Sequence, residues 1–174
     1  LFLLNGPRMA DVIERYTWLT GRPALPTKQS LGFCASTMYY AELEQGCDQE
    51  IHKVIDKHLQ EKLYIDHFWL ASGYSAGEAD GLRYTFNWNY KRFPDPEKFF
   101  ATMNAKGINV IPNLKPGVLE HHPYAQYYED HDAFIKAPGG EGDAYGRWWG
   151  GEGRFIDFTG PAGRDAWKHL LKET

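Results

Sequence analysis

Residues 95–113, with the sequence DPEKFFATMNAKGINVIPN, decide the fold class of this chain. The opening Asp-Pro pair is a typical helix start, because Asp accepts hydrogen bonds from free backbone amides and Pro fits the first turn. Phe99, Phe100 and Met103 follow at helical spacing and predict the buried face of that helix. A glycine then ends the helix, and the apolar run at residues 108–111 predicts a buried strand. A helix that leads directly into a buried strand indicates a parallel α/β fold.

The same alternation of strand and helix lies on the N-terminal side of this stretch. Residues 31–34 and 63–70 are apolar runs that we predict as strands, and Asp48 is the predicted cap of a helix between them. The apolar stripe of that helix consists of Ile51, Val54, Ile55, His58 and Leu59. These elements extend the parallel sheet by two strands.

The two ends of the chain carry further elements. Residues 1–4 predict a short strand, and a helix with apolar periodicity follows and ends at Gly21. Residues 155–158 predict another strand, and the Gly-Pro pair at residues 160–161 opens a last helix. The core of the chain therefore contains three or four βα units, too few for a closed eight-stranded barrel of about 250 residues.

Composition excludes several classes of function. The chain has 174 residues and a formal net charge of -4, without a run of Lys or Arg, so no nucleic acid partner is expected. No apolar stretch is long enough to span a membrane. Cys34 and Cys47 are too few for a disulfide framework, and they leave open whether the protein is cytoplasmic or secreted. The aromatic content of 16% suits a protein that packs rings against sugars.

Two groups of residues, three histidines and three acids, are candidates for metal binding or catalysis. The three histidines lie in one long loop, at a spacing that matches no zinc motif, and a solvated loop is the better interpretation. They are His121, His122 and His131.

Glu42, Asp66 and Asp157 are candidates for the paired carboxylates of glycosidic bond cleavage. Asp66 lies in an apolar run without a matching second carboxylate, and a structural role is favoured. We predict no metal and no organic cofactor.

Several motifs in their order along the chain resemble glycoside hydrolase family 31. The motifs are Tyr16-Thr17-Trp18-Leu19-Thr20-Gly21-Arg22-Pro23, Ser30-Leu31-Gly32-Phe33, Phe93-Pro94-Asp95-Pro96, Trp149-Gly150-Gly151 and Phe155-Ile156-Asp157-Phe158-Thr159-Gly160-Pro161. Their order and spacing resemble the family over nearly the whole chain.

The resemblance implies a specific architecture. Residues 1–28 would be the end of an N-terminal β-sandwich domain with its linker helix, and residues 29–174 the N-terminal portion of a (β/α)8 TIM barrel. The family's nucleophile and acid/base are Asp residues on later strands, so both are expected beyond Thr174 and no catalytic residue is assigned within the chain. The rest of the same polypeptide would then be needed to complete the barrel.

The resemblance also implies positions that contact the substrate. Trp149 matches a Trp beside the innermost sugar, and Asn113 and Lys115 fall at the end of the third barrel strand, where the family lines its pocket. Ala71 falls where α-glucosidases have an Asp that holds a sugar hydroxyl, and Met38 falls where an aromatic residue is common. Loss of that Asp removes a hydrogen bond worth about 1.5–3 kcal/mol, so the sugar need not be glucose.

Four further residues complete the predicted substrate contacts. Ser72 and Tyr74 replace the family's usual acidic and apolar pattern after the second strand. Arg147 is expected to donate to sugar hydroxyls, and Trp148 to form an aromatic platform together with Trp69.

The leading hypothesis is a retaining α-glycosidase that acts on terminal α-linked sugars of oligosaccharides, represented by a fragment that is inactive alone. A non-catalytic carbohydrate-binding module is the alternative from another class, because aromatic and amide side chains suffice for binding. A lyase or transglycosylase on the same scaffold is the third.

Overall fold

The computed structural model describes residues 1–148 and 150–174. The chain divides into two units, Leu1–Leu31 and Gly32–Thr174. The assignment of residues 1–28 to a preceding β domain stays a prediction. No helix in the described part of the chain is long and apolar enough to cross a membrane.

The first unit contains helix α1 (Met9–Thr20) and a 3₁₀ turn, η1 (Gln29–Leu31). The backbone N–H and the guanidinium of Arg8 both donate to the Asp11 carboxylate, at 3.1 and 2.7 Å, and Gly21 follows the helix with a φ of 88°. The predicted helix and its stop at Gly21 are therefore confirmed. The predicted strand at residues 1–4 is wrong, because these residues pair with none of the described strands.

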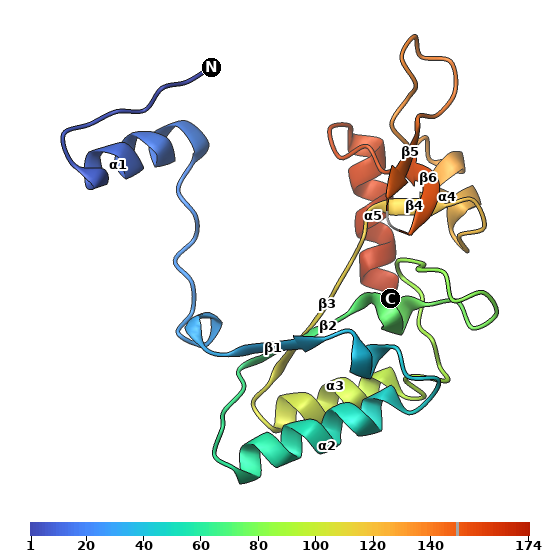
Figure 1. Ribbon diagram of the computed structural model, residues 1–174. Coiled ribbons are helices and arrows are strands. Elements are labelled where there is room, and N and C mark those ends of the chain that lie inside the picture. The colour runs from blue at the N-terminus through green and yellow to red at the C-terminus, as the bar shows by residue number, and fades with distance from the viewer. Residues whose placement is uncertain (149) are drawn as a thin grey trace. The chain divides into compact units, whose positions relative to one another are not determined.

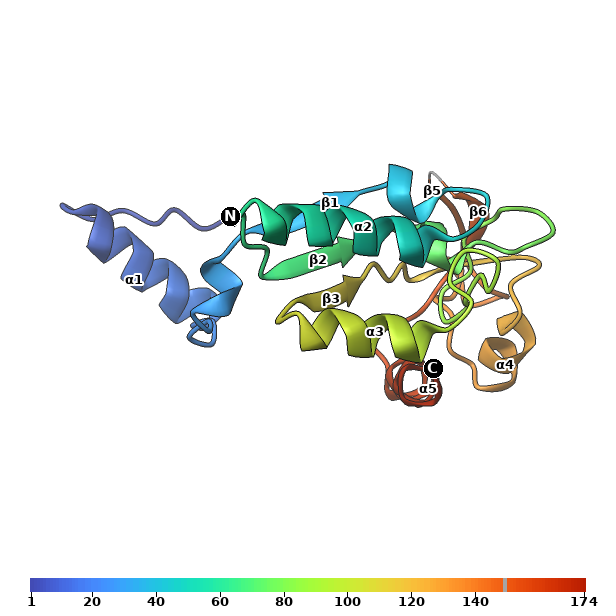
Figure 2. The same cartoon turned by 90° about the horizontal axis from the view of Figure 1, so that it is seen from below.

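Three parallel strands form the central sheet of the second unit. They are β1 (Cys34–Thr37), β2 (His67–Leu70) and β3 (Asn109–Pro112), in the order β1-β2-β3. Helix α2 (Cys47–Gln60) connects β1 to β2, and helix α3 (Pro96–Ala105) precedes β3. Figures 1 and 2 show α2 and α3 side by side along the sheet. The predicted parallel α/β organisation is confirmed for these three strands.

The core lies between this sheet and the two helices. Ile51 and Ile55 of α2, and Phe99 of α3, pack with Phe68 and Leu70 of β2, and each of these five side chains is at most 2% exposed. Because side chains alternate along a strand, Trp69 projects from the opposite face, where it is 46% exposed. Helices α2 and α3 thus cover one face of the sheet, and the opposite face is exposed at Trp69.

The strand and helix boundaries differ from those predicted by a few residues. Strand β1 begins at Cys34, because Leu31, which was predicted to start it, is the last residue of the turn η1. Strand β2 is shorter than the predicted 63–70, since Leu63 and Tyr64 are exposed. Helix α2 is preceded by Gly46 at a φ of 67°, which leaves the predicted cap, Asp48, in the first turn instead. In α3 the Asp95 carboxylate accepts from the Lys98 N–H at 2.9 Å, and the predicted cap there is confirmed.

A second, antiparallel sheet was not predicted. Strands β4 (Gly117–Leu119), β5 (Tyr145–Trp148) and β6 (Gly151–Phe155) pair in the order β4-β6-β5. Val118 of β4 packs in a second core with buried residues of helix α4 (Ala125–Asp130) and helix α5 (Pro161–Glu173). The strand predicted at residues 155–158 is wrong: β6 ends at Phe155 and runs antiparallel, so it adds no unit to the parallel sheet.

Two short 3₁₀ turns follow the first two parallel strands and pack against each other. They are η2 (Tyr39–Ala41) after β1 and η3 (Ser72–Ser75) after β2. The Arg92 guanidinium donates to the carbonyl oxygen of Gly73 at 2.8 Å and to that of Ala41 at 3.5 Å. A Cβ atom on Gly73 would collide with the Ala41 carbonyl, so the approach of the two turns requires glycine.

We expect Gly73→Ala to destabilise the protein that carries this chain by about 1–3 kcal/mol, since the added methyl group forces the turns apart. Gly160→Ala is the matched control, because its Cβ would lie 3.5 Å from the nearest atom, an ordinary contact. Urea unfolding of both variants checks this. Equal stability of the two variants would contradict the packing described for η2 and η3.

Candidate functional site

The C-terminal ends of the three parallel strands meet at one edge of the sheet. Thr37 of β1 is in register with Leu70 of β2, which is in register with Pro112 of β3. The residues that follow each strand therefore converge on that edge, which is where parallel α/β proteins place their binding sites.

A pocket of about 540 Å³ lies at this edge, and it is called the sheet-edge pocket below. It is lined by Ser36, Met38, Trp69, Leu70, Ala71, Ser72, Asn113 and Lys115. Six of these residues were predicted as substrate contacts: Met38, Trp69, Ala71, Ser72, Asn113 and Lys115. The structure brings these six together, and their roles in binding stay predictions. Ser36 was missed, although its position near the end of the first predicted strand is a usable signal.

Trp69 supplies the largest apolar surface of the sheet-edge pocket. Its ring is on the face of the sheet that is not covered by α2 and α3. Ser36 of β1 and Ile111 of β3 are its register partners on the two neighbouring strands. The Ser36 hydroxyl donates to the Trp69 carbonyl oxygen at 3.2 Å, across the two strands. An accessible indole beside hydroxyl and amide groups can stack on the apolar face of a ring while polar groups hold its rim.

Lys115 and Asn113 form the polar side of the pocket. Lys115 Nζ donates to the Asn113 amide oxygen at 2.9 Å. Burial lowers the pKa of the Lys115 ammonium, and the positive charge of Arg83 lowers it further. The Thr85 hydroxyl donates to the Lys115 carbonyl oxygen, so the loop that carries Thr85 anchors the backbone of this segment.

Tyr74, a predicted substrate contact, does not line the sheet-edge pocket, and its role in binding stays a prediction. It is 3% exposed, its ring centroid lies 4.6 Å from that of Trp88, and burial raises the pKa of its hydroxyl. Its hydroxyl donates to the Asn113 carbonyl oxygen at 3.2 Å. Tyr74 lies in the 3₁₀ turn η3, which directs its ring into the protein, and its hydroxyl holds the backbone of Asn113.

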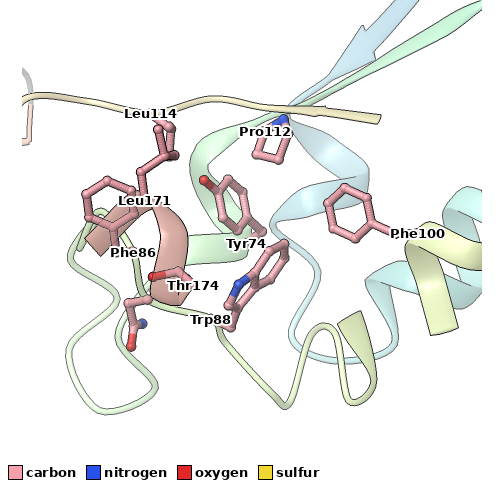
Figure 3. A pocket seen from close by; sticks show the side chains of 9 residues that line it. Tyr74, Phe86, Trp88, Phe100, Pro112, Leu114, Leu171 and Thr174 are labelled. Atoms are coloured by element: carbon pink, nitrogen blue, oxygen red, sulfur yellow. The ribbon is translucent and has the colours of Figure 1, made fainter. Parts of the chain in front are cut away.

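Tyr74 belongs to a second, mainly apolar pocket of about 250 Å³ (Figure 3). The residues that line it are Tyr74, Phe86, Asn87, Trp88, Phe100, Pro112, Leu114, Leu171 and Thr174. In Figure 3 the rings of Tyr74 and Trp88 point into it, and the end of α5 closes one side. It offers few polar groups to orient a sugar.

The remaining predicted contacts lie apart from the sheet-edge pocket. Arg147 and Trp148 are on β5 of the antiparallel sheet and are not among the residues that line the pocket. The Trp148 indole instead covers Gly117 of β4, where a Cβ would lie 2.9 Å from the ring. The predicted contacts of Arg147 and Trp148 with a sugar stay predictions. Trp149 lies outside the described residues.

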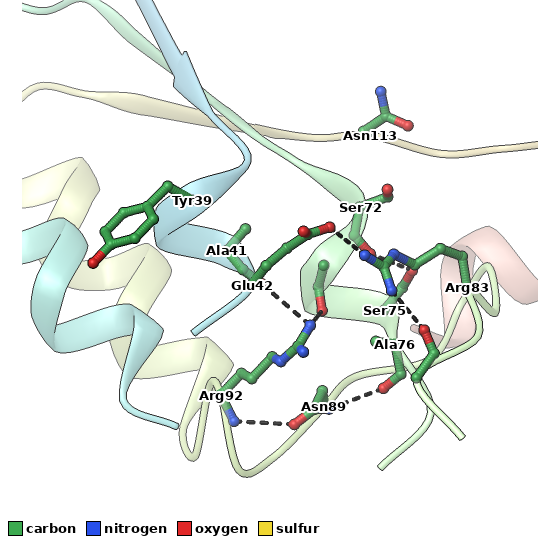
Figure 4. A network of polar contacts seen from close by, with 12 residues as sticks. Tyr39, Ala41, Glu42, Ser72, Ser75, Ala76, Arg83, Asn89, Arg92 and Asn113 are labelled. Carbon is green, nitrogen blue, oxygen red and sulfur yellow. Dashed lines mark hydrogen bonds and ion pairs between the residues drawn. The ribbon is translucent and has the colours of Figure 1, made fainter. Parts of the chain in front are cut away.

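A polar network joins the loops behind the pocket (Figure 4). The Arg83 guanidinium donates to the Glu42 carboxylate and to the Gly81 carbonyl oxygen. The side chains of Arg83 and Glu42 are 15% and 31% exposed. Asn89 donates to the Ala76 carbonyl oxygen at 3.0 Å and accepts from the Arg92 N–H at 3.0 Å. The network fixes the segment after β2, which carries Ala71 and Ser72.

The three carboxylates considered for catalysis have structural partners. Glu42 is paired with Arg83. Asp66 accepts from the Phe33 N–H at 3.2 Å, which positions the start of β1. Asp157 accepts from the Thr159 N–H and hydroxyl at 2.8 and 2.6 Å, and these bonds, the hydroxyl's first, lower the pKa of its carboxyl. None of the three lines the sheet-edge pocket.

The histidines of the long loop do not share one environment. His121 and His131 are exposed, as expected for a solvated loop. His122 is 4% exposed, and this part of the prediction is wrong, because Tyr84 and Tyr128 pack around its ring. Burial lowers the pKa of His122 to about 4, partly offset by a hydrogen bond with the Thr85 backbone. Within the described residues no group of histidine, cysteine, aspartate or glutamate side chains could hold a metal ion.

Comparison with known proteins identifies the family. The sequence profile of the glycosyl hydrolases family 31 TIM-barrel domain matches residues 23–174. The chain belongs to glycoside hydrolase family 31. It is 34% identical over 169 residues to alpha-glucosidase 2 of Bacillus thermoamyloliquefaciens, covering 95% of this chain and 20% of that protein. It is 31% identical over 174 residues to neutral alpha-glucosidase C of Macaca fascicularis, covering 98% of this chain and 21% of that protein.

A solved structure supports the same family. The glucosidase II alpha subunit, in a DNJ-bound form, superposes with a TM-score of 0.79 at 27% identity, covering 96% of this chain and 17% of the other. The chain thus spans about a fifth of the length of the relatives it matches. The resemblance stated from the sequence motifs is confirmed, and with it the assignment to a glycosidase family with a TIM-barrel domain.

The Glu42–Arg83 ion pair is expected to stabilise the folded protein. Glu42→Gln is expected to cost about 1–3 kcal/mol, because it leaves a largely buried guanidinium without its carboxylate. Glu50→Gln breaks the Lys53–Glu50 pair, whose side chains are 69% and 41% exposed, and should cost less than about 0.5 kcal/mol. Chemical denaturation of the two variants makes the comparison. A larger loss in Glu50→Gln than in Glu42→Gln would refute the role given to the network.

Proposed function

We propose that the protein that carries this chain is a retaining α-glycosidase and that the sheet-edge pocket holds the sugar whose bond is cleaved. One observation carries the proposal: the ends of three parallel strands assemble Trp69, Asn113 and Lys115 in one pocket, within the barrel domain of a glycosidase family. A volume of about 540 Å³ is within the range of small-molecule sites.

The pocket residues can bind and orient a sugar. The indole of Trp69 offers an apolar surface for a pyranose face, and the side chains of Asn113 and Ser72 offer hydrogen bonds to its hydroxyls. Lys115 holds the Asn113 amide oxygen, so the amide nitrogen is turned toward other partners. Such fixed groups reduce the entropy lost when the substrate is positioned.

The catalytic carboxylates are proposed to lie on strands outside this chain. A retaining glycosidase uses one carboxylate as nucleophile and a second group as acid and base. The partners of Glu42, Asp66 and Asp157 favour structural roles for these acids. Strands β1 and β3 each pair on only one side among the described strands, which supports a sheet continued by the rest of the same polypeptide.

A carbohydrate-binding protein without hydrolysis is the second candidate. The observation that favours it is that the eight described residues lining the pocket include an indole, an amide and two hydroxyl groups but no carboxylate. A screen of the full protein against nitrophenyl α-glycosides of glucose, galactose, xylose and N-acetylgalactosamine separates the two. Release of nitrophenol with retention of the anomeric configuration supports the glycosidase, and sugar binding without release supports the binding protein.

In an active glycosidase, we expect Asn113→Ala to lower kcat/KM by about tenfold or more, because a hydrogen bond to the bound sugar is lost. Gln126→Ala is the matched control, since this exposed amide on α4 donates to Asp130 at 2.9 Å and does not line the pocket. Steady-state kinetics on the preferred nitrophenyl glycoside measures both. An unchanged kcat/KM in Asn113→Ala would place the substrate outside this pocket.

A further inference from the structure

The segment at the end of β3 runs between the two pockets. Asn113 and Lys115 line the sheet-edge pocket, whereas Pro112 and Leu114 line the second, mainly apolar pocket (Figure 3). This alternation is that of an extended chain, in which successive side chains lie on opposite sides. A shift of the backbone at residues 112–115 would therefore move two polar side chains of the sheet-edge pocket at once.

Two buried hydroxyl groups hold this backbone at the residues that face the sheet-edge pocket. The Tyr74 hydroxyl donates to the Asn113 carbonyl oxygen at 3.2 Å, and the Thr85 hydroxyl donates to the Lys115 carbonyl oxygen. Tyr74 and Thr85 are 3% and 6% exposed. Such bonds restrict the backbone strongly, because a buried polar group that loses its partner cannot turn to water instead.

Tyr74 and Thr85 belong to the loop between β2 and α3, residues 71–95, whose own hydrogen bonds hold it together. The Tyr84 N–H donates to the Ser75 carbonyl oxygen at 3.1 Å, and the Asn89 N–H donates to the Tyr74 carbonyl oxygen at 2.7 Å. The two hydroxyl groups are thus carried by one folded loop, and they hold the segment after β3 at two points.

The loop backbone adopts an unfavourable conformation directly after Thr85. Phe86 has a φ of 63°, in the left-handed region that a bulky side chain rarely occupies. Its ring is 5% exposed, and its centroid lies 4.8 Å from that of the Trp167 ring of α5. The turn at Phe86 therefore places its ring against α5 while Thr85 donates to Lys115. Strained backbone persists where the surrounding structure fixes it, and it is frequent at functional sites.

We propose that Tyr74 and Thr85 are positioning residues for substrate binding, whose hydroxyl groups fix the backbone from which Asn113 and Lys115 reach the bound sugar. Neither Tyr74 nor Thr85 lines the sheet-edge pocket, so both act through the segment that they hold. This inference rests on the proposed function, because it concerns the same pocket. Polar groups that are fixed before the sugar binds lose less freedom on binding, so loss of either hydroxyl weakens the complex.

Removal of each hydroxyl from the full protein tests the inference, with calorimetry of glucose, galactose, xylose and N-acetylgalactosamine as the measurement. Tyr74→Phe and Thr85→Val should each weaken the binding of the preferred sugar by about three- to tenfold, and Thr85→Ser should restore most of the affinity. Tyr84→Phe is the matched control. It removes the hydroxyl of another buried tyrosine of the loop, which donates to Asp80 at 2.6 Å, and it should leave the affinity unchanged.

A double-mutant cycle shows whether Tyr74 acts through Asn113. In an Asn113→Ala background, Tyr74→Phe should change the affinity by less than about twofold, because the side chain that Tyr74 positions is absent. A general loss of stability would instead weaken binding equally in both backgrounds. Urea unfolding identifies variants that fold, and the Thr85 variants carry the test if Tyr74→Phe does not.

The results separate this inference from the proposed function. Unchanged affinity in a folded Tyr74→Phe or Thr85→Val protein, or an equal loss in Tyr84→Phe, would overturn the inference even if α-glycosides are hydrolysed. A loss in Tyr74→Phe that disappears in the Asn113→Ala background supports it, even if no α-glycoside is hydrolysed and the protein proves to be a binding module. Failure of the unmodified protein to bind any of the four sugars overturns the inference as well.

Discussion

The parallel register of β1, β2 and β3 is the constraint on which the site depends. Because Thr37, Leu70 and Pro112 end at the same level, residues separated by more than thirty positions in sequence follow one another along a single edge. The alternation of side chains in the same register sends Phe68 and Leu70 into the core and Trp69 to the free face. One set of backbone hydrogen bonds thus stabilises the core and builds the pocket.

A second layer of contacts keeps the ends of the strands in place. The 3₁₀ turns after β1 and β2 approach closely only because Gly73 has no side chain, and the Arg92 guanidinium joins their carbonyl groups. The Glu42–Arg83 pair stabilises the loop that follows. These groups lie behind the pocket, where their charges hold the ends of the strands in position.

Local patterns in the sequence predicted the parallel part of the fold well. The Asp95 cap, the apolar face of α3 and the strand after it depend on near neighbours, and so they can be read from spacing. The antiparallel sheet could not be predicted in this way: β4 and β6 pair across more than thirty residues, and β6 is glycine-rich, so its sequence lacks the apolar alternation of a strand. Burial of His122 has the same origin, because Tyr84 approaches it from a distant loop. In the candidate site, Asn113 and Lys115 could be predicted because they follow the end of a predicted strand. The inward orientation of Tyr74 could not, because it depends on packing against Trp88.

A crystal structure of the full protein with a bound sugar tests the central claim most directly. The account predicts that the sugar ring lies against the Trp69 indole, with at least one of its polar atoms within hydrogen-bond distance of the Asn113 or Lys115 side chain. A sugar bound elsewhere, with the sheet-edge pocket occupied by other parts of the polypeptide, would contradict it.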